Sequence, residues 1–108
     1  MGKEIYTLIW SPKATRDLDR LHDWIAEQAP RTAVTYLQGL IKYVERIRRF
    51  PYRGHPVRDP MAPEAETPYR DIHFKKQRII YAVKGRAIVI HTIIHQRRYF
   101  RMGLVVPI

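Results

Sequence analysis

The segment AIVIHTIIH, Ala87–His95, decides the fold of this chain because it is apolar on both alternating sets of positions. A β-strand with apolar side chains on both faces is usually central in its sheet. The segment RIIYAV, Arg78–Val83, precedes it, and Gly85 lies between them, where a tight turn can need a positive φ. These two segments therefore predict an antiparallel pair of strands inside a sheet.

Two more strands are expected, one on each side of a helical region. Tyr69–Phe74 is the nearer one in sequence, and Ile5–Trp10 alternates in the way that strands do. Residues 51–68 hold five prolines and a glycine, which is too dense for a helix or a central strand, so we expect a loop there. The tail, residues 99–108, is either a further short strand or a cover for apolar surface.

Two helices are expected between the first strand and this loop. Ser11 can cap a helix and Pro12 fits its first position, and apolar residues spaced by four, three and four carry the helix to about Ala29. After the break at Pro30, a second helix is expected over residues 31–49. The order β-α-α-β-β-β predicts an α+β fold, one domain over residues 1–108, with a helical hairpin packed on one face of a mostly antiparallel sheet.

The positive charge of the chain is concentrated in its last third. The formal charge is +10, from 20 basic and 10 acidic residues, and no Asp or Glu follows Asp71. Because the last third is also the part that reads as strands, a basic sheet with arginines at its strand ends is expected. Such a surface suits an acidic partner: a nucleic acid, an enzyme that acts on nucleic acid, or an acidic peptide.

Several classes of protein are excluded by the composition. The chain has no cysteine, so disulfides, thiolate nucleophiles and cysteine-based zinc sites are excluded. It has no apolar run of the length of a signal peptide or a membrane span, and we expect a cytoplasmic protein. None of the five histidines shows ligand spacing with nearby carboxylates, so neither a metal nor a cofactor is expected.

Five strings in this order resemble the RelE/ParE toxin superfamily of bacterial toxin–antitoxin systems. The strings are Trp10-Ser11-Pro12-Lys13-Ala14 with Asp17-Leu18, Phe50-Pro51-Tyr52-Arg53-Gly54-His55-Pro56, Tyr69-Arg70, Arg78-Ile79-Ile80-Tyr81, and Ile94-His95-Gln96-Arg97-Arg98. The resemblance covers roughly residues 5–98. The chain is most similar to the ParE branch, in which the long helical hairpin and the closing His-x-Arg-Arg are typical.

The resemblance to ParE implies a protein that poisons DNA gyrase without catalysis of its own. We expect Arg97, Arg98 and Tyr99, with the basic sheet edge, to form the target-binding surface. It also implies a small acidic antitoxin, ParD-like or similar, that forms a hetero-oligomer with the chain. We expect this antitoxin to cover apolar grooves along the helical hairpin and the sheet edge. A member that keeps antitoxin binding but has little toxicity is a further possibility.

The RelE branch implies an alternative function, cleavage of messenger RNA on the ribosome. Arg78 and Arg97 fall where RelE-like toxins place phosphate-binding arginines, and His95 could shuttle protons, as could Tyr99. The chain departs from the RelE pattern at two points. Asp71 lies in the strand where that pattern has two lysines, and Tyr99 is shifted from the expected position.

Each of these basic residues also has a purely structural interpretation. Arg78 and Arg97 could form salt bridges or remain solvated, and Arg70 could pair with an acid of the first helix such as Asp17. His91 lies between apolar neighbours in its strand, which predicts a hydrogen-bonded core histidine.

The aromatic residues of the helical region are expected to serve packing. We expect Trp10 and Trp24 in the core or between the helices. Tyr36 and Tyr43 lie on one side of the second helix, where the edge of the core is favoured over partner binding.

Overall fold

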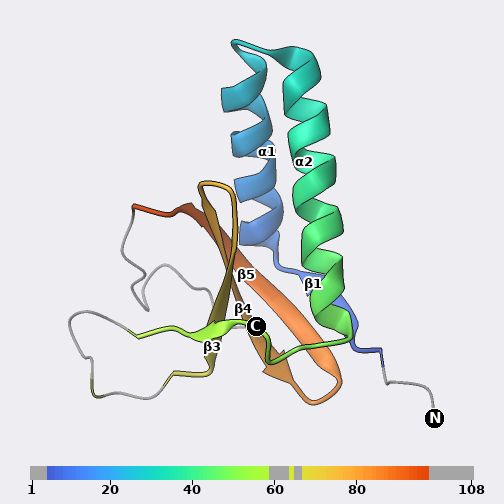
Figure 1. Cartoon of the computed structure of the whole chain (residues 1–108), viewed down its shortest axis with the longest axis vertical. Helices are drawn as coiled ribbons and strands as arrows, with labels where there is room; N and C mark the ends of the chain where they lie inside the picture. Colours follow the sequence, from blue (N-terminus) through green and yellow to red (C-terminus); the bar gives the residue numbers. More distant parts are fainter. Residues whose placement is uncertain (1–4, 59–63, 65–66, 98–108) are drawn as a thin grey trace.

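The computed structural model describes residues 5–58, 64 and 67–97. Its elements run along the chain in the order β-α-α-β-β-β-β (Figure 1). They are β1 (Thr7–Trp10), α1 (Pro12–Ala26), α2 (Pro30–Glu45) with a 3-10 turn η1 (Arg46–Arg48), β2 (His55–Pro56), β3 (Tyr69–Phe74), β4 (Gln77–Lys84) and β5 (Ala87–His95). The predicted α+β class is confirmed, and the added strand β2 lies inside the segment expected to be loop.

The five strands form one sheet in the order β1-β5-β4-β3-β2. β5 lies between β1 and β4, so its expected place inside the sheet is confirmed. The pairings β2–β3, β3–β4 and β4–β5 are antiparallel, whereas β1 runs parallel to β5, with Thr7 opposite Ala87 and Trp10 opposite Ile90. The sheet is therefore mixed and mostly antiparallel. β1 and β5 can run parallel because two helices and three strands separate them along the chain.

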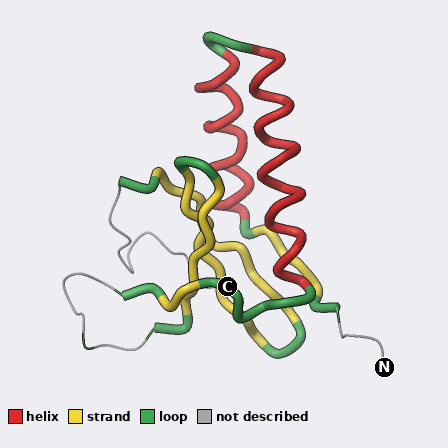
Figure 2. The backbone as a smooth tube through the Cα atoms, viewed as in Figure 1, coloured by secondary structure: helices red, strands yellow, loops and turns green. Residues whose placement is uncertain are grey.

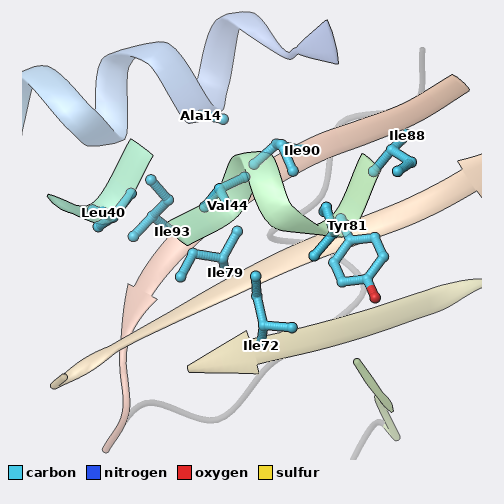
Figure 3. Close-up of a cluster of buried hydrophobic side chains, with 10 residues drawn as sticks. Ala14, Leu40, Val44, Ile72, Ile79, Tyr81, Ile88, Ile90 and Ile93 are labelled. Carbon is cyan, nitrogen blue, oxygen red and sulfur yellow. The ribbon is translucent and has the colours of Figure 1, made fainter. Parts of the chain in front are cut away.

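The helices α1 and α2 lie side by side as a hairpin whose tip points away from the sheet (Figures 1 and 2). The ends of both helices nearer the sheet cover one of its faces and close the main core. Figure 3 shows the apolar side chains that meet there, from α1, α2 and the strands β3, β4 and β5. The fully buried members include Ala14, Leu40, Val44, Ile79 and Ile90.

The N-terminus of α1 is fixed to the edge of β5 beyond the end of β1. The Ser11 hydroxyl accepts from the Ala14 amide at 3.0 Å, as expected of a cap, and donates to the His91 carbonyl at 2.9 Å. Six residues later, the Asp17 carboxylate accepts from the Ile93 amide at 3.0 Å and from the Thr92 hydroxyl. Side chains of α1 thus satisfy backbone groups of β5 that no strand pairs.

The helix boundaries differ from the expected ones near each proline. α1 ends at Ala26, before the expected end near Ala29. Pro30 begins α2, where its fixed φ suits the first helical position, and it does not stand outside the helix. The regular part of α2 ends at Glu45. The 3-10 turn η1 follows it, and Arg49, where the helix was expected to end, caps this turn.

A β-bulge in the β4–β5 pair changes which side chains face the helices. Ile80 is opposite Thr92 and Tyr81 is opposite Ile90, so His91 is an extra residue on β5. As a result Ile88, Ile90 and Ile93 all belong to the main core. His91 is buried, as expected of a core histidine, and its ring makes an edge contact with the Tyr69 ring at 5.1 Å between centroids.

The opposite face of the sheet carries a second, smaller apolar cluster. Val57 from the chain after β2 packs there against Ile80 and Ile94, with Tyr69 at the margin. Since neighbouring residues of a strand point to opposite faces, this cluster identifies the face that is turned away from the helices.

Gly85, Tyr36 and Tyr43 behave as the sequence predicts, and Gly39 lies where α2 meets β3. Gly85 has a φ of +58° in the β4–β5 turn. A Cβ on Gly39 would lie 3.3 Å from the Phe74 ring, so the glycine does allow a close approach of α2 to β3. Tyr36 and Tyr43 contact the same ring at 5.5 Å and 5.6 Å between centroids, at the edge of the core.

Candidate functional site

The arginine expected at a scissile phosphate, Arg78, is occupied by an ion pair. Its Nε and Nη2 donate to Asp71 Oδ2 at 2.9 Å and 2.6 Å. The Arg78 side chain is 16% exposed and that of Asp71 is 9% exposed, so the pair is largely withdrawn from water. His73 Nε2 lies 3.7 Å from the same oxygen. The structural alternative for Arg78, a salt bridge, is present and joins β3 to β4.

His95 and Arg97 lie together at the end of β5, apart from Arg78. The Arg97 amide donates to His95 Nδ1 at 3.1 Å, and both residues are at least partly exposed. Gln77 is opposite His95 in the register, and Arg78 is opposite Ile94. Because cross-strand partners project to one face and sequence neighbours to opposite faces, Arg78 and His95 point to opposite faces of the sheet.

The three residues of the RNase hypothesis therefore form no common site. Arg78 lies on the face of the smaller apolar cluster, beside Asp71, while His95 lies on the face that α1 covers in part. A general acid or base must be within hydrogen-bond reach of the atom it serves. Of the surface expected to bind the target, Arg97 is exposed, whereas Arg98 and Tyr99 fall outside the described residues.

Arg70 holds the loop before β2 and not the first helix. Its Nη1 donates to the Gly54 carbonyl at 2.8 Å and to the Tyr52 carbonyl at 3.2 Å, and its guanidinium lies 5.1 Å from the centre of the Tyr52 ring. The expected pair with Asp17 is wrong, because that carboxylate is used by Lys13 and by β5. Sequence spacing gave no sign of the two carbonyls that Arg70 binds.

Tyr81 fixes the same loop from inside the core. Its hydroxyl donates to the Pro51 carbonyl and accepts from the Gly54 amide, each at 2.8 Å. Burial raises the pKa of the Tyr81 hydroxyl above its ordinary value. A Cβ on Gly54 would lie 2.6 Å from this hydroxyl and 2.6 Å from the Asp71 carbonyl, so only glycine fits there. This contact explains the glycine of the FPYRGHP string.

The loop held in this way presents aromatic and basic side chains to solvent. Phe50 is 50% exposed and Tyr52 is 61% exposed, although Pro51 between them is buried. Together with four exposed cations they form what we term the corner patch: Lys42, Arg46, Arg49, Phe50, Tyr52 and Arg53. No pattern in the sequence predicted a role for this surface.

A second surface feature is a cleft between α1 and the ends of β4 and β5. It has a volume of about 300 Å³, and we term it the hairpin cleft; it is lined by Asp17, Arg20, Leu21, Trp24, Gln77, Ile93, Ile94 and His95. Trp24 is 68% exposed, so its expected burial is wrong, because the hairpin extends past the sheet that would cover it (Figure 1). Trp10 does pack against the core, as predicted.

The described part of the chain holds neither a cluster of metal-ligand side chains nor a membrane-spanning helix. No group of three or more His, Cys, Asp or Glu residues there is placed to hold a metal ion. Nor is any helix within residues 5–58 both long and apolar enough to span a bilayer.

Comparison with solved structures shows the same fold in two toxin–antitoxin complexes. The chromosomal ParDE system of P. aeruginosa matches with a TM-score of 0.70 and 23% identity, over 85% of this chain and 97% of the other. The RelBE2 complex of Mycobacterium tuberculosis matches with a TM-score of 0.62 and 22% identity, over 90% of this chain and 98% of the other. No match was found among curated protein sequences.

The sequence model of one family covers most of the chain. It describes the ParE toxin of the type II toxin–antitoxin system parDE, and it matches residues 8–100. This range contains all of the helices and strands described above except the first residue of β1. The chain therefore belongs to the ParE toxin family, within the RelE/ParE superfamily of type II toxins.

Proposed function

We propose that this protein inhibits DNA gyrase by binding it, without catalysis of its own, and that a cognate antitoxin neutralises it. The family match supports a toxin of the ParE branch. The position of Arg78 favours gyrase binding over RNA cleavage. Its guanidinium is held by Asp71, on the face of the sheet opposite to His95, so the residues that would cleave RNA do not meet.

The target-binding surface in this proposal begins at the exposed end of β5. Arg97 lies there, next to an acid-free stretch of sequence that also contains Arg98 and Tyr99. Positive charge that is not used inside the fold remains available to an acidic partner and speeds association with it.

A supercoiling assay with purified gyrase and relaxed plasmid tests the proposal. Excess toxin is expected to abolish supercoiling and to leave cleaved DNA bound to gyrase. The variant Arg97→Ala plus Arg98→Ala should inhibit at least tenfold less well. A matched variant, Arg16→Ala plus Arg31→Ala, removes the same charge from exposed positions of the hairpin and should inhibit like the wild type. Normal supercoiling in excess wild-type toxin would overturn the proposal.

A translation extract separates the alternative function from this one. With ribosomes and a defined message present, primer extension should show intact RNA at toxin concentrations that stop gyrase. Cleavage of ribosome-bound message would instead support the RelE-like activity. If neither gyrase nor message is affected and induction without antitoxin leaves growth normal, the chain is a member that has lost its toxicity.

The hairpin cleft is our proposed seat for the antitoxin. It combines apolar walls from Leu21, Trp24 and Ile93 with the basic Arg20 at its side. An acidic segment with an apolar anchor would bury the exposed indole and offset charge. Titration of a Trp24→Phe variant and the wild type with the cognate antitoxin tests this. The fluorescence change on binding should vanish in the variant, which retains Trp10; an unchanged signal would exclude the cleft.

A further inference from the structure

The corner patch combines exposed positive charge with exposed aromatic rings. Within the described residues, Lys42, Arg46, Arg49 and Arg53 form no ion pair, and the single acid among them, Glu45, is 3.2 Å from Arg48. The aromatic rings of Phe50 and Tyr52 are at least half exposed in the middle of this charge. Exposed aromatic surface costs free energy, so a clustered instance points to a binding surface.

Two adjoining hollows run along the patch. One, of about 620 Å³, is lined by Arg49, Phe50, Pro51, Tyr52 and Arg53. The other, of about 370 Å³, is lined by Lys42, Glu45, Arg46, Arg49, Phe50 and Arg53. Because Arg49, Phe50 and Arg53 line both, the hollows form one continuous track from the last turns of α2 to the loop before β2.

The backbone that carries the rings is rigid. The Arg53 amide donates to the Phe50 carbonyl at 3.0 Å, and the Phe50 amide donates to the Ile47 carbonyl at 3.1 Å. The residues between and after the rings are held by Tyr81 and Arg70, as described above. A ligand that docks on the patch therefore has little loop ordering to offset, which favours binding.

We propose that the corner patch binds single-stranded DNA, with bases stacked on Phe50 and Tyr52 and phosphates beside the surrounding guanidinium groups. Aromatic platforms in a cationic groove are the arrangement by which proteins hold single strands without sequence preference. An acidic peptide would use the cations but has no need of two solvent-exposed aromatic rings. The choice of DNA rests on the proposed function, because gyrase acts on DNA. The patch would let the toxin hold DNA and gyrase together.

The test is fluorescence polarisation with the full chain and a labelled 12-nucleotide single-stranded DNA of mixed sequence, without gyrase. Phe50→Ala should weaken binding roughly 10-fold, within the range of one stacked base, and leave the salt dependence unchanged. Arg49→Ala plus Arg53→Ala should lower the slope of log affinity against log salt by about 1.4, because each phosphate contact to a single strand contributes about 0.7.

A matched variant shows whether position matters. Val34→Ala plus Arg31→Ala removes one exposed apolar side chain and one exposed cation from α2, and it should bind like the wild type. Equal loss in this variant and in Phe50→Ala plus Arg49→Ala, with native circular dichroism in both, would mean that charge alone attracts DNA and would overturn the proposal.

Two further outcomes would also overturn it. One is tighter binding of RNA than of DNA of the same sequence. The other is displacement of the DNA by polyglutamate at equal charge concentration. The supercoiling assay is independent of this measurement: inhibition of gyrase without DNA binding removes the patch proposal and leaves the function. DNA binding that Phe50→Ala weakens, with unimpaired gyrase, supports the patch and removes the proposed function.

Discussion

The partly buried and the exposed arginines of this protein have different tasks. Arg70 and Arg78 lie on β3 and β4, where the first binds two loop carbonyls and the second binds Asp71. Arg49 and Arg53 lie in the corner patch, where they form no ion pair within the described residues. Net charge alone therefore does not locate a binding surface. The arginines already engaged by the fold must first be set aside.

Asp71→Asn should have the largest effect on stability. It leaves Arg78 largely buried without its counter-charge, and we expect a loss of about 3 kcal/mol in the free energy of unfolding, at the low end for buried pairs because Arg78 keeps some exposure. Urea denaturation measures it. Glu45→Gln is the control, since the exposed Glu45–Arg48 pair should contribute less than about 1 kcal/mol. Equal losses would show that the two pairs do not differ.

Gly54→Ala should come second, with a loss of about 2 kcal/mol from overpacking against the Asp71 carbonyl and the Tyr81 hydroxyl. Thermal unfolding followed by circular dichroism measures it. Gly39→Ala is the matched change, because its new methyl meets only the end of the Phe74 ring and gains helix propensity of up to about 1 kcal/mol. A stable Gly54→Ala protein would mean that the loop can move away from β3.

Tyr81→Phe should cost about 1.5 kcal/mol at neutral pH, because the Pro51 carbonyl and Gly54 amide lose their partner. The raised pKa of Tyr81 has a further consequence. Stability that depends on the neutral hydroxyl is complete below about pH 10 and is lost as the pH rises beyond it, since the unfolded chain ionises first. Tyr36, whose pKa burial also raises, contributes in the same direction.

Urea denaturation between pH 8 and pH 11 checks this pH dependence. The wild type should lose stability above pH 10, and Tyr81→Phe should lose less over the same range. Tyr52→Phe, which changes an exposed ring, should follow the wild-type profile. Parallel profiles for the wild type and Tyr81→Phe would contradict the assignment.

Arg49→Ala plus Arg53→Ala should have the smallest effect on stability, within about 0.5 kcal/mol for each exposed position. The measurement is the same denaturation, and it sharpens the contrast with Asp71→Asn. A loss of several kcal/mol would place these two arginines with those that hold the fold.

Local sequence patterns predicted most of the helices and strands, but they did not predict the contacts between residues that are far apart in the chain. Tyr69–Phe74 and Ala87–His95 were predicted with the observed bounds, because alternation and Gly85 are local signals. β2 has two residues, one of them proline, which is too short for any periodicity to show. The exposure of Trp24 depends on how far the hairpin extends past the sheet, and helix periodicity carries no information about that.

The candidate site was harder to predict for the same reason. Sequence alone offered a salt bridge as one reading of Arg78, yet it could not show that the bulge and register turn Arg78 and His95 to opposite faces. The predicted partner of Arg70 was wrong because every residue has a main-chain carbonyl, so the sequence does not show which carbonyls an arginine binds. The rigid support of the corner patch depends on Tyr81, which is 27 residues away from Gly54.

Arg78 serves the fold, and the proposed inhibition of gyrase needs no phosphate-binding arginine at this position. The most direct measurement is gyrase supercoiling in the presence of the variant Asp71→Leu plus Arg78→Leu, which removes both charges together and can retain stability. Once circular dichroism shows that the variant is folded, we expect inhibition at the wild-type concentration. The result that would contradict this is a folded double variant that no longer inhibits gyrase, together with cleavage of messenger RNA by the wild type but not by the double variant.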